Sequence, residues 1–270
     1  MIDKSRLKKA FNRSASTYDE YAKTQTVVGE ELVALVKELP IISAQVLDIG
    51  SGTGTVALHI SRLFPLAGIF GCDIALAMAT RAEEKSREAN ATGLHFMVAD
   101  GEILPFRDHQ FDLVVSSLTY QWLDNLSSSF KEVYRILRPG GYFAFTLFGK
   151  DTLFELKSSY CNAQNKSGNG HPPHFHEFLE ESSLLPMMEQ SGFINIHISR
   201  SIKQEYHPDI KSIFSTLKAI GAQNVSQEAP RGLGRKELFH WMNIFYEDNF
   251  KTPSGLPLTY EVYYVTAEKG

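Results

Sequence analysis

The apolar positions of the chain change their spacing along its length, and each change marks a different kind of segment. Over residues 3–40 they recur every three or four positions, which predicts two helices, the second from about Thr26 to Leu39. From 45 to 148, short apolar runs alternate with helical stretches. After residue 150 the pattern loosens, until residues 256–267 alternate like a strand. We therefore expect a helical start, a regular α/β centre and a less regular last third.

The central segment predicts a mainly parallel sheet. Apolar runs of strand length are separated by helices long enough for right-handed crossover connections. The expected strands are Gln45–Ile49, Gly68–Asp73, Leu94–Ala99, Phe111–Ser116 and Tyr142–Phe148. The expected helices are Thr55–Leu63, Met78–Asn90 and Ser127–Leu137, the last closed by Pro139-Gly140-Gly141. This order is typical of a doubly wound α/β fold.

The last third predicts additions to that sheet. The polar segment Asn162–Pro173 predicts a loop or mobile lid, and a helix is expected over Phe175–Ser191, ended by Gly192. A strand is expected at 194–206, and residues 209–250 are expected to be mostly helical. We therefore expect a single domain over 1–270 with a seven-stranded, mostly parallel, Rossmann-like sheet. Its expected parts are a helical cap at 1–40, a core at 45–148, a lid and helical additions at 151–250 and a last strand at 256–268.

Composition limits the class of protein further. With 43% hydrophobic and 21% charged residues, the chain is neither disordered, fibrous nor a membrane bundle. No apolar run approaches the ~20 residues that a membrane span needs, and the charged start does not resemble a secretory signal. The only cysteines, Cys72 and Cys161, cannot form a disulfide framework, so we expect a cytoplasmic protein. The net charge of -4 argues against general nucleic-acid binding.

The sharpest motif is the glycine-rich turn Asp48-Ile49-Gly50-Ser51-Gly52-Thr53-Gly54-Thr55, placed between a strand and a helix. Glycines let a backbone approach a ligand closely. A dinucleotide-binding loop follows the pattern G-x-G-x-x-G/A, whereas here Thr55 takes the sixth place and the third glycine comes one residue early. The carboxylate of Asp48 would repel a pyrophosphate and attract a cationic amino-acid ligand. The motif therefore disfavours a nicotinamide-dependent dehydrogenase.

This loop and the segments after it resemble the class I S-adenosylmethionine (SAM) methyltransferases. The resemblance implies that Asp48 faces the methionine end of SAM, that Asp73 accepts hydrogen bonds from the ribose and that Asp100 accepts one from the adenine amino group. Taken alone, Asp73 would be the N-cap of the next helix. The implied cofactor-binding residues are Asp48, Gly50, Ser51, Gly52, Gly54, Asp73, Ile74, Asp100, Gly101, Ser117 and Leu118, with Gln25 at the same mouth and no metal.

Segments outside this core resemble the malonyl-[acyl-carrier protein] O-methyltransferases of biotin synthesis. The resemblance spans nearly the whole chain and rests on the N-terminal run Phe11 to Asp19, on Gln121-Trp122 and on the run Pro257 to Val262. It implies methyl transfer from SAM to the free carboxylate of malonyl-acyl-carrier protein or malonyl-coenzyme A. A carboxylic acid with a pKa near ~4 is already ionised at pH 7. Such a reaction therefore needs no general base and no metal, and the protein has to align the two reactants.

The candidates for holding the acceptor come from both ends of the chain. They are Tyr18, Gln25, Tyr120, Gln121, Trp122, Arg231 and Arg235. Tyr18 and Gln121 would donate hydrogen bonds to the carboxylate, although Tyr18 could equally seal the cofactor. Trp122 could instead be a packing wall. Arg231 could hold the malonyl group or the carrier's phosphopantetheine, or form a surface ion pair. We single out Tyr18, Gln121, Trp122 and Arg231 as the catalytic candidates.

Acyl-carrier proteins are acidic, so a surface that docks one should be basic. The basic residues near the N-terminus are Lys4, Arg6, Lys8, Lys9 and Arg13, and later options are Lys203, Lys211 and Lys218. A run of charge is also typical of a solvated helix face. No nucleic acid and no membrane is expected as a partner.

Three histidines raise the question of a metal site. His171, His174 and His176 have a spacing that metal ligands use, but no cysteine or carboxylate pattern accompanies them, so a solvated segment is expected.

Three alternative functions stay open. One is a SAM-dependent methyltransferase acting on a quinone precursor or a small organic acid. Another is a non-catalytic SAM-binding module, and the third is the dehydrogenase that the glycine loop disfavours.

Overall fold

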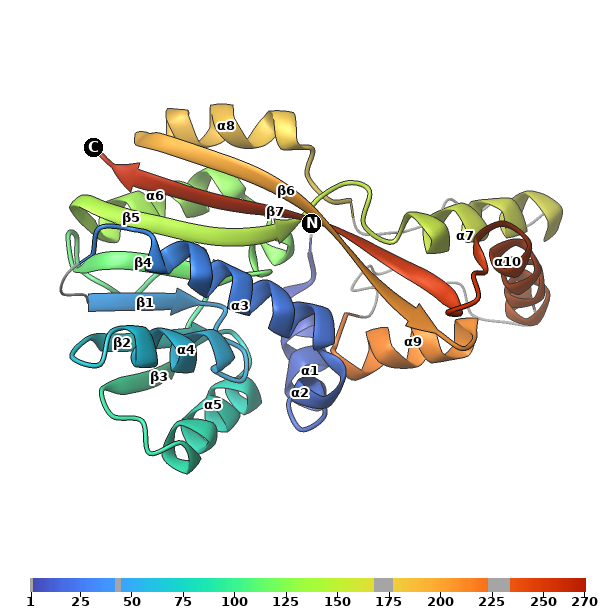
Figure 1. The fold of residues 1–270 in the computed structure, drawn as a ribbon, viewed down its shortest axis with the longest axis horizontal. Coiled ribbons are helices and arrows are strands. Elements are labelled where there is room, and N and C mark those ends of the chain that lie inside the picture. The colour runs from blue at the N-terminus through green and yellow to red at the C-terminus, as the bar shows by residue number, and fades with distance from the viewer. Residues whose placement is uncertain (1, 42–44, 168–176, 223–233) are drawn as a thin grey trace.

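A computed structural model of the protein describes residues 2–41, 45–167, 177–222 and 234–270. Its centre is a seven-stranded sheet with the order β3-β2-β1-β4-β5-β7-β6 (Figure 1). The strands are β1 (Gln45–Ile49), β2 (Gly68–Asp73), β3 (Leu94–Val98), β4 (Phe111–Ser117), β5 (Leu137–Phe148), β6 (Phe193–His207) and β7 (Leu256–Lys269). The first five strands run parallel, while β7 is antiparallel to both β5 and β6. The expected doubly wound, mostly parallel sheet is confirmed.

Helices cover both faces of the sheet because successive side chains of its strands point to opposite sides. Val46 of β1 joins a buried cluster with Leu32, whereas its neighbour Leu47 joins another with Phe130. The helices on the first face include α3 (Lys23–Lys37) and α4 (Thr55–Leu63), and those on the second include α6 (Leu126–Ile136) and α8 (Glu181–Gln190). A further helix, α5 (Leu76–Glu88), packs on β2 and β3. The alternation inside one short strand thus supplies both halves of the core.

The N-terminal segment forms a cap off the carboxyl ends of the parallel strands. It contains α1 (Lys4–Ser14) and α2 (Tyr18–Tyr21), which Figure 1 shows beyond the end of β1. The side chain of Asp3 begins α1 by accepting a hydrogen bond from the Arg6 backbone N–H at 3.0 Å. Phe11, Ala15 and Tyr18 pack against residues at the start of α5. The cap therefore covers the edge where open α/β sheets bind their ligands.

The other end of the molecule is built around β6 and β7, which extend past the other strands in Figure 1. The helices at this end are α7 (Phe154–Ser167), α9 (Ile210–Ala219) and α10 (Gly234–Phe250), and α7 packs on α10. Two buried polar contacts join the helices α7 and α10 to β7. The carboxylate of Glu155 accepts hydrogen bonds from Thr259, and the hydroxyl of Tyr246 donates to the Pro257 carbonyl at 2.6 Å. The run Pro257 to Val262 is thus part of the framework.

Several boundaries differ from the sequence expectation by a few residues, and three differences change the picture. The helix α7 continues to Ser167 into the expected loop, and α8 begins at Glu181 rather than near 175. The segment Pro139-Gly140-Gly141, expected to end a helix, lies inside β5. Gly140 has a φ of +72°, and the pairing of β4 with β5 shifts its register there. A glycine in this conformation suits a bulge, so the breaker residues mark an irregular strand.

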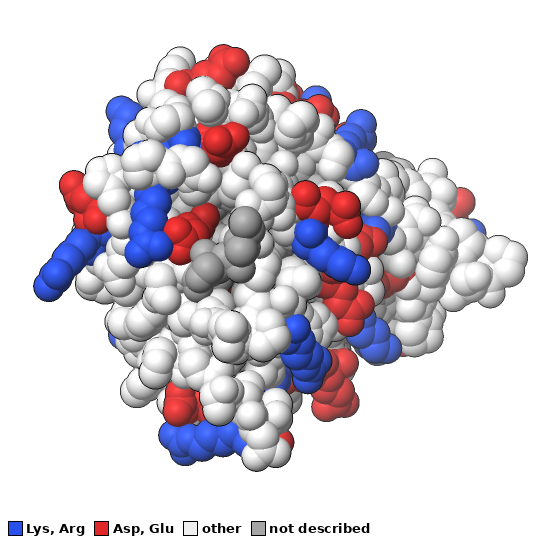
Figure 2. All heavy atoms as spheres, turned by 60° about the vertical axis from the view of Figure 1, so that its left-hand side comes forward, with Lys and Arg blue, Asp and Glu red and all other residues white. Residues whose placement is uncertain are grey.

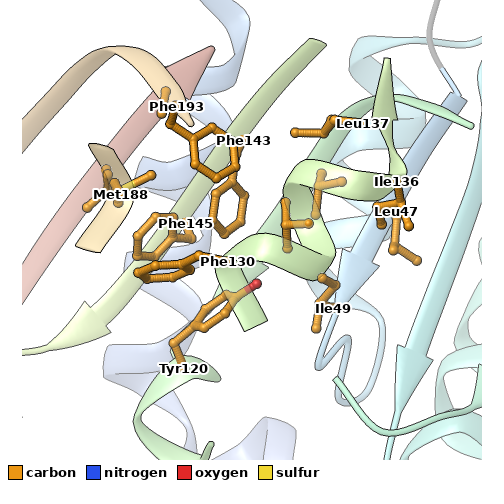
Figure 3. Close-up of a cluster of buried hydrophobic side chains, with 14 of the residues drawn as sticks. Leu47, Ile49, Tyr120, Phe130, Ile136, Leu137, Phe143, Phe145, Met188 and Phe193 are labelled. Carbon is orange, nitrogen blue, oxygen red and sulfur yellow. The ribbon is translucent and has the colours of Figure 1, made fainter. Parts of the chain in front are cut away.

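Tyr120 lies in the core rather than at the expected pocket mouth. It is fully buried among aromatic rings, with centroids 5.2 Å from Phe145, 5.4 Å from Phe130 and 5.6 Å from Phe143 (Figure 3). Such ring pairs stabilise a fold by about 0.5–1.5 kcal/mol beyond burial. The prediction for Tyr120 is wrong because the 3-10 turn at 120–122 sends this ring inward. The same packing anchors the turn that carries Gln121 and Trp122.

Candidate active site

A cavity opens at the carboxyl ends of β1, β2 and β4, under the cap. Its enclosed free space is about 100 Å³, and it is open to solvent at its mouth. Many of the residues singled out from the sequence line it: Tyr18, Gln25, Gly50, Gly52, Asp73, Ile74, Asp100, Gly101, Ser117, Leu118, Gln121 and Trp122. They meet because the ends of parallel strands share one edge of the sheet.

Other residues of the predicted set lie elsewhere. Asp48, Ser51 and Gly54 are not among the residues that line the cavity and sit behind them in β1 and in the turn. Arg231 falls outside the described residues, as do His171, His174 and His176. Of Arg235, only the backbone, at the start of α10, is described. The structure therefore assembles the predicted cofactor side of the site and leaves the arginine unplaced.

The glycine turn is shaped by close neighbours. Gly50, Gly52 and Gly54 have φ values of +69°, +52° and +80°. A Cβ on Gly50 would lie 2.1 Å from the Thr119 hydroxyl oxygen, whereas one on Gly52 would meet nothing. The Gly50 N–H donates to the Cys72 carbonyl at 2.8 Å, and the Gly52 N–H donates to Asp73 Oδ2 at 3.0 Å. The turn is thus tied to β2 and kept open above Gly52.

Asp73 holds this turn rather than capping α5 alone. Its Oδ1 accepts from the Ala75 N–H at 2.7 Å, and the N-cap position of α5 is Ala75. Each carboxylate oxygen has a second lone pair, so both remain able to accept from a ligand. Burial raises the pKa of Asp73 to about 6. This side chain therefore combines a structural contact with an accessible acceptor.

Asp48 is a buried carboxylate with one unused oxygen. It is 1% exposed and accepts a hydrogen bond from the Ala57 backbone, while its Oδ2 has no partner among the described residues. Burial and the negative Asp73 raise the pKa of Asp48 to about 7. Nearby positive charge would favour its ionised form. Its position behind the turn thus suits a cationic ligand.

Lys4 is the single cation among the described residues that line the cavity. Its Nζ lies 2.6 Å from Asp100 Oδ2 and also donates to Glu102. Burial lowers the pKa of Lys4, but the hydrogen bonds to these two carboxylates outweigh burial, and the pKa is raised overall. Lys4 therefore faces the site and is not free to join the basic surface expected from the sequence. With Asp73 also present, the lining carries more negative than positive charge.

A second network joins the cap to the glycine turn. The Thr53 hydroxyl donates to Asp19 Oδ1 at 2.5 Å, and Lys85 Nζ lies 2.7 Å from Asp19 Oδ2. Lys85 also donates to the hydroxyls of Thr53 and Thr55, each at 3.0 Å. Sequence reasoning missed Lys85, since a lysine on a charged helix gives no signal of its partners. The network holds α2, the turn and α5 together.

The residues predicted to hold the methyl acceptor, Tyr18, Gln121 and Trp122, bring aromatic and amide groups to the cavity. Trp122 packs edge-on against Phe11 of the cap, with ring centroids 5.8 Å apart. Burial, with Asp73 and Asp19 nearby, raises the pKa of Tyr18 above its usual range, so its hydroxyl stays protonated. Gln121 donates from Nε2 to the Leu118 carbonyl at 2.5 Å. Leu118 has a φ of +52°, and its N–H donates to the Thr146 carbonyl.

Two features are absent from the part of the chain that the structure describes. No group of three or more histidine, cysteine, aspartate or glutamate side chains there is placed to hold a metal ion. No helix in the same part of the chain is long and apolar enough to cross a membrane.

Known proteins resemble this chain in sequence and in fold. Residues 47–145 match a family model described as a methyltransferase domain. The chain is 37% identical over 264 residues to the "Malonyl-[acyl-carrier protein] O-methyltransferase" of Geobacter sulfurreducens, covering 98% of each. It is 34% identical to the "Biotin biosynthesis bifunctional protein BioHC" of Saccharophagus degradans, covering 96% of this chain and 46% of that one. The structure of the YcgJ protein of Bacillus subtilis shares the fold, with a TM-score of 0.61 and 18% identity over 89% of this chain and 98% of that one.

Proposed function

This chain belongs to the malonyl-[acyl-carrier protein] O-methyltransferase family, and on that premise we propose that it methylates the free carboxylate of malonyl-acyl-carrier protein with SAM. The product would be the malonyl methyl ester that serves biotin synthesis. The observation that carries the proposal is the negatively charged cavity at the sheet edge, partly covered by the N-terminal cap. We treat residues 1–270 as one catalytic domain.

The lining suits SAM because SAM is a cation overall. It bears a positive sulfonium and a positive ammonium group against one carboxylate. Asp73 would accept from the ribose hydroxyls and Asp100 from the adenine amino group, with Ile74 and Gly101 beside the ring. Ser117, Leu118 and the turn at Gly50 and Gly52 would meet the methionine end, and Gln25 the same mouth. Asp48 would add negative charge from behind the turn.

The chain's own task in the reaction is to align the two reactants and to exclude water from them. SAM supplies an electrophilic methyl group, and the malonyl carboxylate is ionised at neutral pH. Holding a reactant in line contributes up to roughly 7–11 kcal/mol to such a reaction. Phe11 and Trp122 close the cavity above the reactants. Burying the carboxylate requires a hydrogen-bond donor, and the protonated hydroxyl of Tyr18 is our candidate.

The same lining weakens the competing functions. A nicotinamide dinucleotide would bring two phosphates to a site whose single described cation, Lys4, is already paired. A quinone precursor methylated at carbon or at a hydroxyl needs a general base. No histidine is among the described lining residues, and the carboxylates there, Asp73 and Asp100, are the ones that we assign to SAM. A carboxylate that accepts the methyl group requires neither a phosphate-binding cation nor a general base. A small organic acid also has such a carboxylate. The carrier therefore has to be tested directly.

For docking of the acidic carrier we propose the outer side of α1. Lys8, Lys9 and Arg13 are exposed there, whereas Lys4 faces the cavity and Arg6 pairs with Asp3. The face drawn in Figure 2 has basic and acidic side chains interspersed and offers no broad basic area. A carrier docked on α1 would stand beside the cavity, because the inner side of this helix, with Leu7 and Phe11, lines it.

The experiment that tests the function is intact-mass analysis of malonyl-acyl-carrier protein after incubation with the protein and SAM. Acetyl-acyl-carrier protein, whose acyl group has no free carboxylate, is the matched control. A gain of one methyl group on the malonyl form alone would support the proposal. Retained SAM binding with no gain on either carrier would contradict it and direct the search to small-molecule acceptors.

A further inference from the structure

The side-chain amide of Gln121 has one end satisfied and the other unused. Its Nε2 donates to the Leu118 carbonyl at 2.5 Å, while its Oε1 is buried and has no partner among the described residues. A backbone carbonyl can only accept, so the nitrogen has to face Leu118 and the oxygen is the free group. Gln121 is 8% exposed and lines the cavity. A buried oxygen left unpaired in this way requires a donor.

The corner of the cavity around Gln121 contains acceptors. The Leu118 carbonyl, the Gln121 amide oxygen and the Gly50 carbonyl belong to residues that line it. Thr119 directs its hydroxyl away, toward the carbonyls of Gly50 and Ser117 at 3.4 and 3.3 Å. Asp48 Oδ2, near the end of the adjacent strand β1, is another buried oxygen without a described partner, as are the hydroxyl oxygens of Ser51 and Tyr120. A ligand group that meets such a set has to be a donor, and an ammonium group, with three N–H bonds and a positive charge, satisfies it best.

We propose that Gln121 Oε1 accepts a hydrogen bond from the α-ammonium group of SAM. The proposal rests on the proposed function in taking SAM as the ligand. It differs from the sequence-based prediction that Gln121 donates to the acceptor carboxylate, because one of its two amide N–H bonds is taken by the Leu118 carbonyl and the buried atom left without a described partner is the oxygen. A flipped amide would set its oxygen against the Leu118 carbonyl oxygen. Gln121 is thus a cofactor-binding residue that contacts the amino-acid end of SAM.

The consequence is a specificity that can be measured without turnover. S-adenosylhomocysteine (SAH) has the α-ammonium group, and its deaminated analogue differs only by a hydrogen in that place. If Gln121 Oε1 contacts this group, the wild-type protein prefers SAH, and removing the oxygen reduces that preference. If Gln121 only holds the backbone of Leu118, its loss weakens both ligands equally.

The test is calorimetric titration of the full chain with each ligand separately. We expect Gln121→Met, which keeps the side-chain length, to lower the ratio of the two affinities about tenfold, as losing one hydrogen bond to a charged group does. Gln121→Glu, which keeps an acceptor oxygen and adds negative charge but loses the N–H to Leu118, should retain or increase the ratio even where both affinities fall. The matched control is Gln204→Met in β6, outside the cavity lining, which should leave the ratio unchanged. Melting temperatures report whether each variant folds.

Each outcome separates this inference from the proposed function. A wild-type ratio near one, or an unchanged ratio in folded Gln121→Met, overturns the role of Gln121 and leaves the malonyl reaction standing. If Gln121→Met does not fold, a fall of the ratio in Gln121→Glu overturns it. A reduced ratio in Gln121→Met supports the role even where malonyl-acyl-carrier protein is not methylated. Absence of SAH binding to the wild type overturns both.

Discussion

Lys4 and Asp100 lie far apart in the chain, yet Lys4 Nζ and Asp100 Oδ2 meet at 2.6 Å beside the cavity. The contact joins α1 to the loop after β3. Asp100 is also the residue that we expect to bind the adenine amino group. The position of the cap and the adenine end of the site are therefore linked through one carboxylate.

The first prediction concerns this ion pair. In Lys4→Met, α1 loses its contact with Asp100 and Glu102, so the backbone amides of residues 4–14 should exchange hydrogen several-fold faster. Both partners are about 30% exposed, so the free energy of unfolding should fall by less than about 1 kcal/mol. Hydrogen exchange followed by mass spectrometry measures the first effect. Lys8→Met, on the outer side of the same helix, is the control. Equal exchange in the two variants would contradict the role of Lys4.

The second prediction concerns pH. The pKa of Asp48 is raised in the folded protein to about 7, above its usual value near 4, so the folded state binds a proton that the unfolded chain has released. Stability of the ligand-free protein should therefore fall as the pH rises from 4 to 8. Asp48→Asn removes the part of this dependence that Asp48 contributes, whereas Asp73, whose pKa is also raised, keeps its own part. The substitution should raise the free energy of unfolding at pH 8 by roughly 1 to 4 kcal/mol.

The same substitution should weaken SAM binding, because the negative charge behind the glycine turn is lost. Denaturant unfolding at pH 5 and pH 8, with SAH titration on the same samples, measures both effects. Parallel stability curves for the wild type and the variant would show that Asp48 does not titrate as expected.

The third prediction concerns the network of Asp19, Thr53 and Lys85. Lys85→Met leaves Asp19 without its cation and frees the turn from α5, so the affinity for SAH should fall about three- to tenfold. Arg87→Met is the control, since Arg87 lies on the same helix, is 74% exposed and pairs only with Glu83 among the contacts described. If both variants bind SAH like the wild type, the network does not support the turn.

The fourth prediction concerns the carrier. Charge reversal in Lys8→Glu with Lys9→Glu should raise the KM for malonyl-acyl-carrier protein about tenfold and leave kcat unchanged, because docking and not alignment is affected. The difference should shrink at high salt, where exposed charges are screened. Lys131→Glu, exposed on α6, changes the charge elsewhere and serves as the control. An unchanged KM at low salt would remove α1 from the docking surface.

The predictable parts of the fold are those where one local signal is enough. The strand β1 and the helix α4 begin and end where the sequence indicated, since a change of period on either side of the glycine turn marks both. The turn at 120–122 is different. Its sequence suggested three pocket residues, but packing against Phe130 and Phe145 draws Tyr120 into the core and leaves Gln121 and Trp122 at the cavity.

The distant contacts of the site could not be predicted. Nothing local to Lys4 indicates Asp100, and nothing local to Lys85 indicates Asp19. The run Pro257 to Val262 shows the opposite problem, because it identifies the family without lining the cavity. Its Glu261 is 1% exposed and pairs with Arg200 across the strands, with Nε and Oε1 2.6 Å apart. A recognisable motif here marks the framework.

The place of β7 between β5 and β6 has a consequence for the order of events during synthesis. Among the strands that the structure describes, β6 pairs only with β7, which is made after it. As the chain leaves the ribosome, the five parallel strands have their partners early, whereas the 15 residues of β6 have none. An unpaired strand of this length is an edge on which chains aggregate. Until the last strand has emerged and inserted, the edges of β5 and β6 that face β7 therefore both stay unpaired.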